Sequence, residues 1–167
     1  PEDEAGPCIV VEDSFKALQD IAAFYREQLP VKVVGITGSV GKTSTRTMIA
    51  TALAAGFHTF QTAGNANSQV GVPITLSRIT DDYEAAVIEL GMSEPGEMAR
   101  IGAIAGLNVA VMTNIGISHI EQLGSQANIL REKLHITDGL ADDGWMILNG
   151  DDAYLCPEHN HNEDGIF

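Results

Sequence analysis

The run Lys42-Thr43-Ser44 has the residue types and spacing that phosphate chemistry requires. It follows the turn Gly38-Ser39-Val40-Gly41, which itself follows an apolar stretch. In a phosphate-binding loop, small residues let backbone N–H groups surround anionic oxygens, the lysine reaches the terminal phosphates, and a hydroxyl binds magnesium. The strict spacing is not met, because Ile36 occupies the first glycine position and Gly35 lies one residue early. The alternative is a tight strand-to-helix turn with a surface lysine.

A carboxylate closes another apolar run, because Glu89 follows Ala85 to Ile88. A buried carboxylate is costly unless it is paired or binds a metal. Because Glu89 closes a predicted strand at the edge where ligands bind in a parallel sheet, we expect it to face the phosphate loop. An edge carboxylate that faces water is the alternative. Glu94 and Glu97 are expected to form a solvated start of a helix.

Two later residues, His119 and Lys133, have both an ordinary and a chemical interpretation. His119 could bind magnesium, but magnesium prefers oxygen, and a surface hydrogen-bonding role is favoured from the residue alone. Lys133 could be a solvated cation beside Glu132. Near bound cations, however, its pKa would fall, and the neutral amine could react with carbon dioxide to form a metal-binding carbamate.

Polar residues of the loops offer weaker signals. Asn65 and Asn67 supply uncharged donors and acceptors for a polar substrate, or they simply favour a turn. The stretch 149–152 could meet a nucleotide or form a turn. The segment 158–164 could hint at metal, although a frayed acidic terminus is the expected interpretation.

The spacing of apolar residues predicts strands that alternate with helices, and hence a doubly wound α/β fold with a mostly parallel sheet and ligands at the carboxyl ends of the strands. Predicted strands are 8–11, 31–37, 57–61, 84–90, 109–113 and 145–148, and predicted helices are 12–28, 43–55, 73–79, 96–105 and 125–140. In the first helix, Phe15, Leu18, Ile21, Ala22 and Tyr25 form an apolar stripe, and Ser14 is the expected cap.

Composition limits the classes of partner. The chain has 167 residues and a net charge of −14, with only nine Lys and Arg, which argues against nucleic acid. An acidic protein that binds polyphosphate must bring cations as metal ions or borrow basic residues. No apolar run is long enough to span a membrane. The acidic N-terminus lacks the basic segment followed by an apolar segment that is typical of a secretory signal. With Cys8 and Cys156 expected to be reduced, we predict a cytoplasmic protein.

Five motifs in order, GITGSVGKTS, GNANSQVGVPITL, AVIELGMSEPGEM, MTNIGISHIEQLGSQANILREKLHITDGL and ILNGDD, resemble the central ATP-binding domain of the Mur ligases. The similarity runs from about Cys8 to Leu155. The stretch GNANSQVGVP favours the members that add D-alanyl-D-alanine to UDP-N-acetylmuramoyl-tripeptide in peptidoglycan synthesis. A ligase that adds the third amino acid, or a folylpolyglutamate or cyanophycin ligase, would share the phosphate loop, Glu89 and Lys133.

The resemblance implies an ATP- and Mg²⁺-dependent amide-forming ligase that acts through an acyl phosphate and is a monomer at full length. It implies catalytic roles for Lys42, Lys133 and His119, and a carbamylated Lys133 in the full enzyme. The implied magnesium ligands are Thr43, Glu89, His119 and Lys133, and Asn65 and Asn67 meet the UDP-linked substrate. The implied ATP-binding residues are Thr37, Gly38, Ser39, Val40, Gly41, Lys42, Thr43 and Ser44.

Family members have three domains, so the resemblance also implies how this chain is organised into domains. Residues 1–30 are expected to be the end of an N-terminal domain and a linker helix. Residues 31–155 are expected to be an incomplete ATP-binding domain, and residues 156–167 an acidic tail. We therefore expect the isolated chain to bind nucleotide weakly and to catalyse no ligation. Outside the family, a simple P-loop NTPase with an unmodified Lys133, or a non-catalytic binding module, would retain the same sheet.

Overall fold

The structure, a computed structural model, describes residue 6 and residues 8–156. Its centre is a five-stranded sheet in the order β2-β3-β1-β4-β5, and every pairing is parallel. The strands are β1 (Lys32–Thr37), β2 (Thr59–Gln61), β3 (Ala85–Glu89), β4 (Leu107–Met112) and β5 (Leu140–Leu148). The predicted doubly wound α/β class is therefore confirmed.

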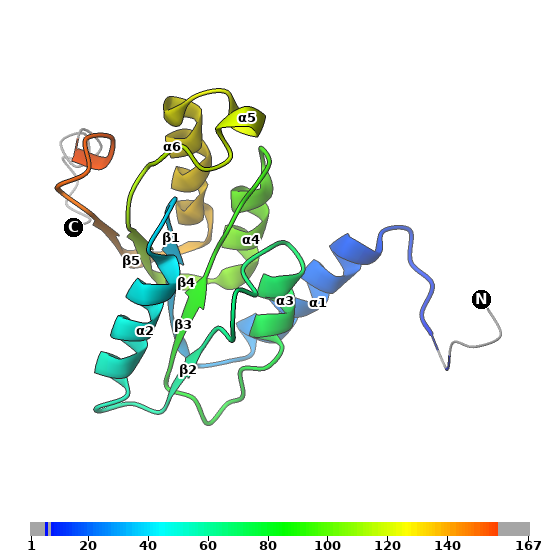
Figure 1. The fold of residues 1–167 in the computed structure, drawn as a ribbon. Helices are drawn as coiled ribbons and strands as arrows, with labels where there is room; N and C mark the ends of the chain where they lie inside the picture. Colours follow the sequence, from blue (N-terminus) through cyan, green and yellow to red (C-terminus); the bar gives the residue numbers. More distant parts are fainter. Residues whose placement is uncertain (1–5, 7, 157–167) are drawn as a thin grey trace.

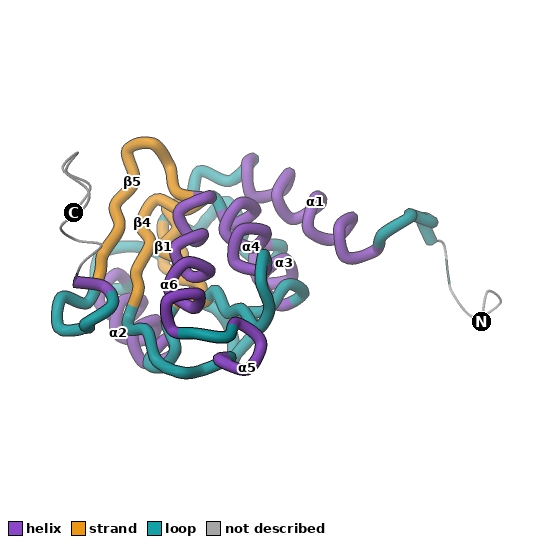
Figure 2. Tube along the Cα trace, turned by 90° about the horizontal axis from the view of Figure 1, so that it is seen from above, coloured by secondary structure: helices purple, strands orange, loops and turns teal. Residues whose placement is uncertain are grey.

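Helices cover the two faces unequally (Figures 1 and 2). The larger core joins one face of the sheet to α1 (Ser14–Glu27), α3 (Gly71–Leu76), α4 (Glu97–Ala105) and α6 (Gln126–Leu134). On the other face, Ile36, Val87 and Val111 pack against α2 (Lys42–Leu53) through Ala50. In right-handed crossovers, the direction in which a connection moves across the sheet decides which face its helix covers. The connection from β1 to β2, which contains α2, moves towards the β2 edge, whereas the later connections move towards the β5 edge. The helix α2 therefore lies on the opposite face from α3, α4 and α6. The same parallel arrangement brings the carboxyl ends of all strands to one edge.

The N-terminal region differs from the sequence prediction. Cys8 to Val11 form no strand, since a strand needs a hydrogen-bonded neighbour and none is present for them in the described part of the chain. In α1 the cap is Asp13, whose side chain accepts a hydrogen bond from the Lys16 N–H, and not Ser14. Two members of the predicted stripe, Phe15 and Ile21, are exposed.

Instead, α1 is held at its C-terminal end by the buried Arg26. The guanidinium donates hydrogen bonds to the backbone carbonyls of Ala105, Leu29, Val31 and Gly106 at 2.8–3.1 Å. These contacts join α1 to the end of α4, because Ala105 and Gly106 end that helix. Burial lowers the pKa of Arg26 below its ordinary value.

The C-terminal half also departs from prediction in its bounds. The helix expected over 125–140 is α6 followed by a 3₁₀ turn, η1 (His135–Gly139). At this turn Gly102 and Gly139 bring α4 and η1 into backbone contact, which leaves no space for a Cβ at Gly139 and little space at Gly102. β5 then begins at Leu140, earlier than expected. No helix within residues 8–156 is long and apolar enough to cross a membrane.

Candidate functional site

A cavity of about 220 Å³ opens where the loops that follow β1, β2, β3 and β4 meet. Parallel strands place these loops at one edge, which is the usual position of ligands in this architecture. The predicted site residues that line the cavity are Gly38, Ser39, Lys42, Asn67, His119 and Lys133. Residues far apart in the sequence thus meet in one hollow.

The phosphate loop has the backbone geometry expected from its glycines. Gly38 has φ 144° and Gly41 has φ 84°, values that side-chain-bearing residues rarely adopt. Gly41 is the N-cap of α2, and no side chain caps that helix. The first N–H groups of α2 therefore remain available to an anion, which the helix dipole also favours. The Lys42 Nζ bonds to the Gly38 carbonyl at 2.8 Å.

The loop after β4 fixes the shape of the phosphate loop, a role that the sequence analysis missed. The Asn114 Oδ1 accepts hydrogen bonds from the N–H groups of Ser39 and Val40 at 3.1 and 3.0 Å. The Thr113 hydroxyl donates to the Val40 carbonyl at 2.6 Å. Thr113 also lies so close to Gly38 that a Cβ there would overlap its hydroxyl. The position of Asn114 directly after a buried strand was the available signal.

Glu89 is buried, with 1% of its surface exposed, at the carboxyl end of β3. Its Oε1 forms an ion pair with the Arg46 Nη1 at 3.1 Å, yet this oxygen has no hydrogen bond of good geometry. The Asn67 Nδ2 donates to its Oε2 at 3.4 Å. The negative charge of Glu89 also partly offsets the effect of burial on Lys42, whose pKa is lowered overall. Glu89 thus lies beneath the cavity, and the alternative of a water-facing edge carboxylate is wrong.

Lys133 lies on α6, and only 2% of its surface is exposed. Burial, together with the positive charge of Lys42, lowers its pKa from 10.5 to about 8, and Glu132 offsets part of this shift. The neighbouring Glu132 is itself buried and accepts a hydrogen bond from the Met98 N–H in α4 at 3.0 Å. Lys133 is therefore not a solvated helix-face cation.

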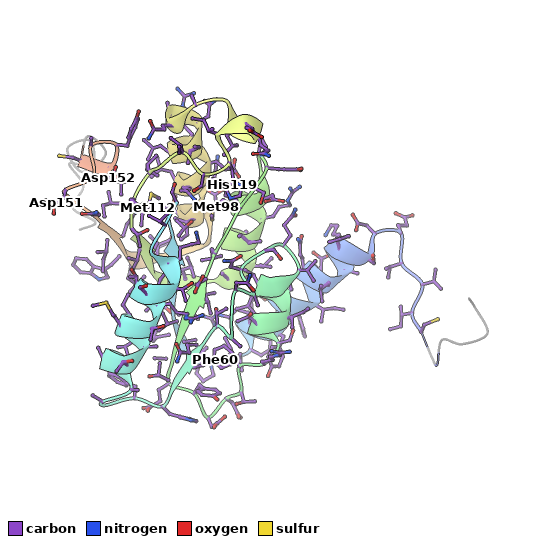
Figure 3. The ribbon with its side chains drawn as sticks, viewed as in Figure 1. Phe60, Met98, Met112, His119, Asp151 and Asp152 are labelled. Atoms are coloured by element: carbon purple, nitrogen blue, oxygen red, sulfur yellow. The ribbon has the colours of Figure 1, made fainter. Side chains whose placement is uncertain are left out.

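The remaining predicted residues occupy more open positions. His119 is exposed, has φ 65°, and begins the short helix α5 (Ile120–Leu123). Figure 3 shows His119 near the same end of the sheet as α5. Thr43, Ser44 and Asn65 are also exposed and do not line the cavity. Thr37 is fully buried, and its Oγ1 has no hydrogen-bond partner among the described residues.

The side chain of Glu97 is partly buried and hydrogen-bonded, whereas we expected it to be solvated at the start of a helix. Its carboxylate accepts hydrogen bonds from the N–H groups of Ser93 and Glu94, at 2.6 and 3.2 Å, and from the Gln69 Nε2 at 2.7 Å. Burial acts to raise the pKa of Glu97, but these hydrogen bonds and the charge of Arg100 leave it below its ordinary value. Glu97 thus joins the loops that follow β2 and β3 beside the cavity.

The stretch 149–152 forms a turn that supports the site. The Asp152 carboxylate accepts hydrogen bonds from the N–H groups of Tyr154 and Leu155, and its Oδ2 accepts from the Ile115 N–H at 3.0 Å. Figure 3 shows Asp151 and Asp152 beyond the end of β5, at the opposite side of the molecule from α1. The segment 158–164 lies outside the described residues.

The side chains present fit a magnesium ion that is shared with phosphate. Among residues 6 and 8–156, no three His, Cys, Asp or Glu side chains gather into a metal cluster. Magnesium does not require one, because it commonly uses one or two carboxylates together with water and substrate phosphates. The buried Glu89 Oε1, which lacks a hydrogen bond of good geometry, is an oxygen of the required type beside Lys42.

Comparison with known proteins defines the class. The sequence model of the Mur ligase middle domain matches residues 36–163, and the chain belongs to this family. Over 161 residues it is 41% identical to the UDP-N-acetylmuramoyl-tripeptide–D-alanyl-D-alanine ligase of Bacillus subtilis (strain 168), covering 93% of this chain and 35% of that protein. The ligase of the same name from Escherichia coli (strain K12) is 41% identical over 145 residues, which are 87% of this chain and 32% of that protein.

Solved structures agree with the sequence comparison. MurF from Acinetobacter baumannii superposes with a TM-score of 0.87 at 33% identity, covering 91% of this chain and 34% of that chain. The MurF ligase from Thermotoga maritima in complex with ADP gives a TM-score of 0.84 at 30% identity, covering 93% and 36%. The chain thus spans about a third of the length of the curated relatives that it matches.

Proposed function

We propose that the natural protein containing this chain is an ATP-dependent ligase that joins D-alanyl-D-alanine to UDP-N-acetylmuramoyl-tripeptide in peptidoglycan synthesis. The observation that carries the proposal is the convergence of Lys42, Lys133 and Asn67 on one cavity in a chain that is 41% identical to two ligases of that name. This chain would supply the nucleotide-binding part of the enzyme.

In the proposed reaction, a carboxylate oxygen of the tripeptide attacks the γ-phosphorus of ATP, and ADP leaves. The amine nitrogen of D-alanyl-D-alanine then attacks the acyl carbon, inorganic phosphate leaves, and the amine loses a proton. Both steps concentrate negative charge on phosphoryl oxygens, so catalysis depends on positioning and electrostatic stabilisation. The uncapped N-terminus of α2 and the Lys42 ammonium are the groups of this chain that offset that charge.

Glu89 and Thr43 are proposed to hold magnesium, with His119 and a modified Lys133 as further ligands. When bound, magnesium would neutralise phosphate charge and orient the reacting oxygens. Lys133 supports this role because its pKa of about 8 leaves about a quarter of the amine neutral at pH 7.5, and only the neutral amine reacts with carbon dioxide. The resulting carbamate would supply the oxygen donors that magnesium prefers.

The site for the UDP-linked substrate is proposed to include Asn65 and Asn67. Asn67 supports this assignment because it lines the cavity and also contacts Glu89. The proposal also retains the division into 1–30, 31–155 and 156–167, a monomeric full-length enzyme and a cytoplasmic location. These remain predictions of the sequence analysis.

The test uses the whole natural protein with ATP, Mg²⁺, UDP-N-acetylmuramoyl-tripeptide and D-alanyl-D-alanine. We expect ADP release that requires both acceptor substrates, together with a product whose mass equals tripeptide plus dipeptide minus water. Lys133→Ala should abolish turnover, and short carboxylic acids should restore part of it. ADP release that ignores the dipeptide and survives Lys133→Ala would instead identify a simple NTPase.

A further inference from the structure

The buried side chain of Arg46 connects Glu89, a proposed magnesium ligand, to the loop that contains Asn65 and Asn67, the proposed substrate-binding residues. Arg46 lies on α2, four residues after Lys42, and 8% of its surface is exposed. Its Nη1 donates hydrogen bonds to the carbonyls of Thr62 and Gly64 at 2.6 and 2.9 Å. The same nitrogen lies 3.1 Å from the Glu89 Oε1. One nitrogen therefore touches both the end of β3 and the loop that follows β2.

That loop is fastened to β3 by further contacts. The Thr62 Oγ1 accepts a hydrogen bond from the Glu89 N–H at 3.0 Å, and the Thr62 N–H donates to the Val87 carbonyl at 3.1 Å. At its far end the Asn67 carbonyl accepts from the Gly91 N–H at 2.7 Å. Between these two attachments, Arg46 is the charged side chain that holds the backbone of residues 62–64.

The pattern of contacts indicates a positioning role. A buried arginine that served only stability would be expected to saturate its donors, yet the Arg46 Nε has no hydrogen-bond partner among the described residues. The Glu89 Oε1 is left similarly unsatisfied. Buried ion pairs often add little stability relative to apolar side chains of similar volume. The arrangement instead orients Glu89 while it fixes the start of the Asn65–Asn67 loop.

We propose that Arg46 is a positioning residue that sets the orientation of Glu89 and the conformation of residues 62–67, and so links the nucleotide side of the cavity to the side that receives the UDP-linked substrate. This inference rests on the proposed function for the identity of that substrate. Its structural part, the ordering of residues 62–67 by Arg46, does not depend on that identity.

The experiment compares Arg46→Met, Arg46→Lys and wild type in the whole natural protein. Arg46→Met has a shorter, apolar side chain with no donor. Arg46→Lys keeps the charge and has three donors, on a side chain slightly shorter than that of arginine. Arg78→Met, at an exposed position after α3, is the matched control. Amide hydrogen exchange is measured without ligands, and binding of UDP-N-acetylmuramoyl-tripeptide and of ADP without Mg²⁺ is measured by calorimetry.

In Arg46→Met, exchange should accelerate at the amides of Thr62, Ala66 and Asn67, while the amides of β4 keep their rates. The dissociation constant of the UDP-linked substrate should rise about 10- to 100-fold, the usual effect of removing a group that orients a ligand. That of ADP should change by less than about threefold, since its loop contacts remain. Arg46→Lys should restore most of both properties, and Arg78→Met should match wild type.

Unchanged exchange at residues 62–67 in Arg46→Met would overturn the inference. An equal acceleration in β1 and β4 would also overturn it, because it would show a general structural role. If wild type does not bind the UDP-linked substrate, the proposed function fails, and the exchange measurement still decides the role of Arg46.

Discussion

The lowered pKa of Lys133 predicts how carbamate formation at this residue depends on pH. With a pKa of about 8, about a quarter of the amine is neutral at pH 7.5, against about a thousandth for an ordinary lysine with a pKa of 10.5. The reactive fraction is thus larger by a factor of about 240. From pH 7 to pH 9 it should rise from about 9% to about 91%, so carbamate formation at fixed dissolved carbon dioxide should increase across this range.

The assay is ¹³C NMR of the whole natural protein, stripped of carbon dioxide and then supplied with ¹³C-bicarbonate in amounts that keep dissolved carbon dioxide equal at each pH. We expect one carbamate signal that is lost in Lys133→Ala and kept in Lys32→Ala, whose side chain is exposed on β1. A signal that persists in Lys133→Ala, or that shows no rise between pH 7 and pH 9, would refute the reasoning from burial.

Three further predictions concern the same region. Lys133→Met should raise the free energy of unfolding of the carbonate-free protein by about 3 kcal/mol at pH 7, because it removes a buried charge. Urea unfolding should show that this gain shrinks from pH 8 to 10.5, because the wild type becomes more stable over this range, where its unfolded chain binds more protons than its folded chain. Gly38→Ala should abolish ADP binding in calorimetry, because Thr113 occupies the Cβ position, whereas Gly56→Ala, in open space, should not. Asn114→Ala should weaken ADP binding about tenfold, because the Val40 N–H loses its acceptor and the Ser39 N–H keeps only the backbone carbonyl of residue 114.

Much of the fold follows from the sequence because the relevant signals are local. Buried parallel strands are continuous apolar runs, and alternation with helices leaves few topologies. The direction of the strands then places Lys42 and Glu89 at the same edge of the sheet. Strand and helix bounds were less predictable: β5 begins at Leu140, and the helix after Ser125 stops at Leu134. The chain between these two points contacts α4 through Gly102 and Gly139, which lie far apart in the sequence.

The details of the site were less accessible, because they arise from contacts between distant residues. Nothing near Arg46 in the sequence indicates that Thr62 and Glu89 will surround it, although a cation four residues after Lys42 on a helix was a weak signal. Asn114 and Glu97 were likewise assigned to a loop and to a solvated helix start. In α1, periodicity alone could not show that Phe15 and Ile21 would be exposed while Arg26 would be buried.

The distribution of charge explains how such an acidic chain can hold a polyphosphate. Of only nine Lys and Arg, Lys42, Arg46 and Lys133 lie at or directly beneath one cavity. Arg46 is matched by Glu89, but Lys42 and Lys133 repel each other, which is one reason that the pKa of Lys133 falls to about 8. Carbamylation would replace this repulsion by attraction, because it changes Lys133 from a cation into an anion. The buried position of Lys133 would then favour metal binding over direct contact with phosphate.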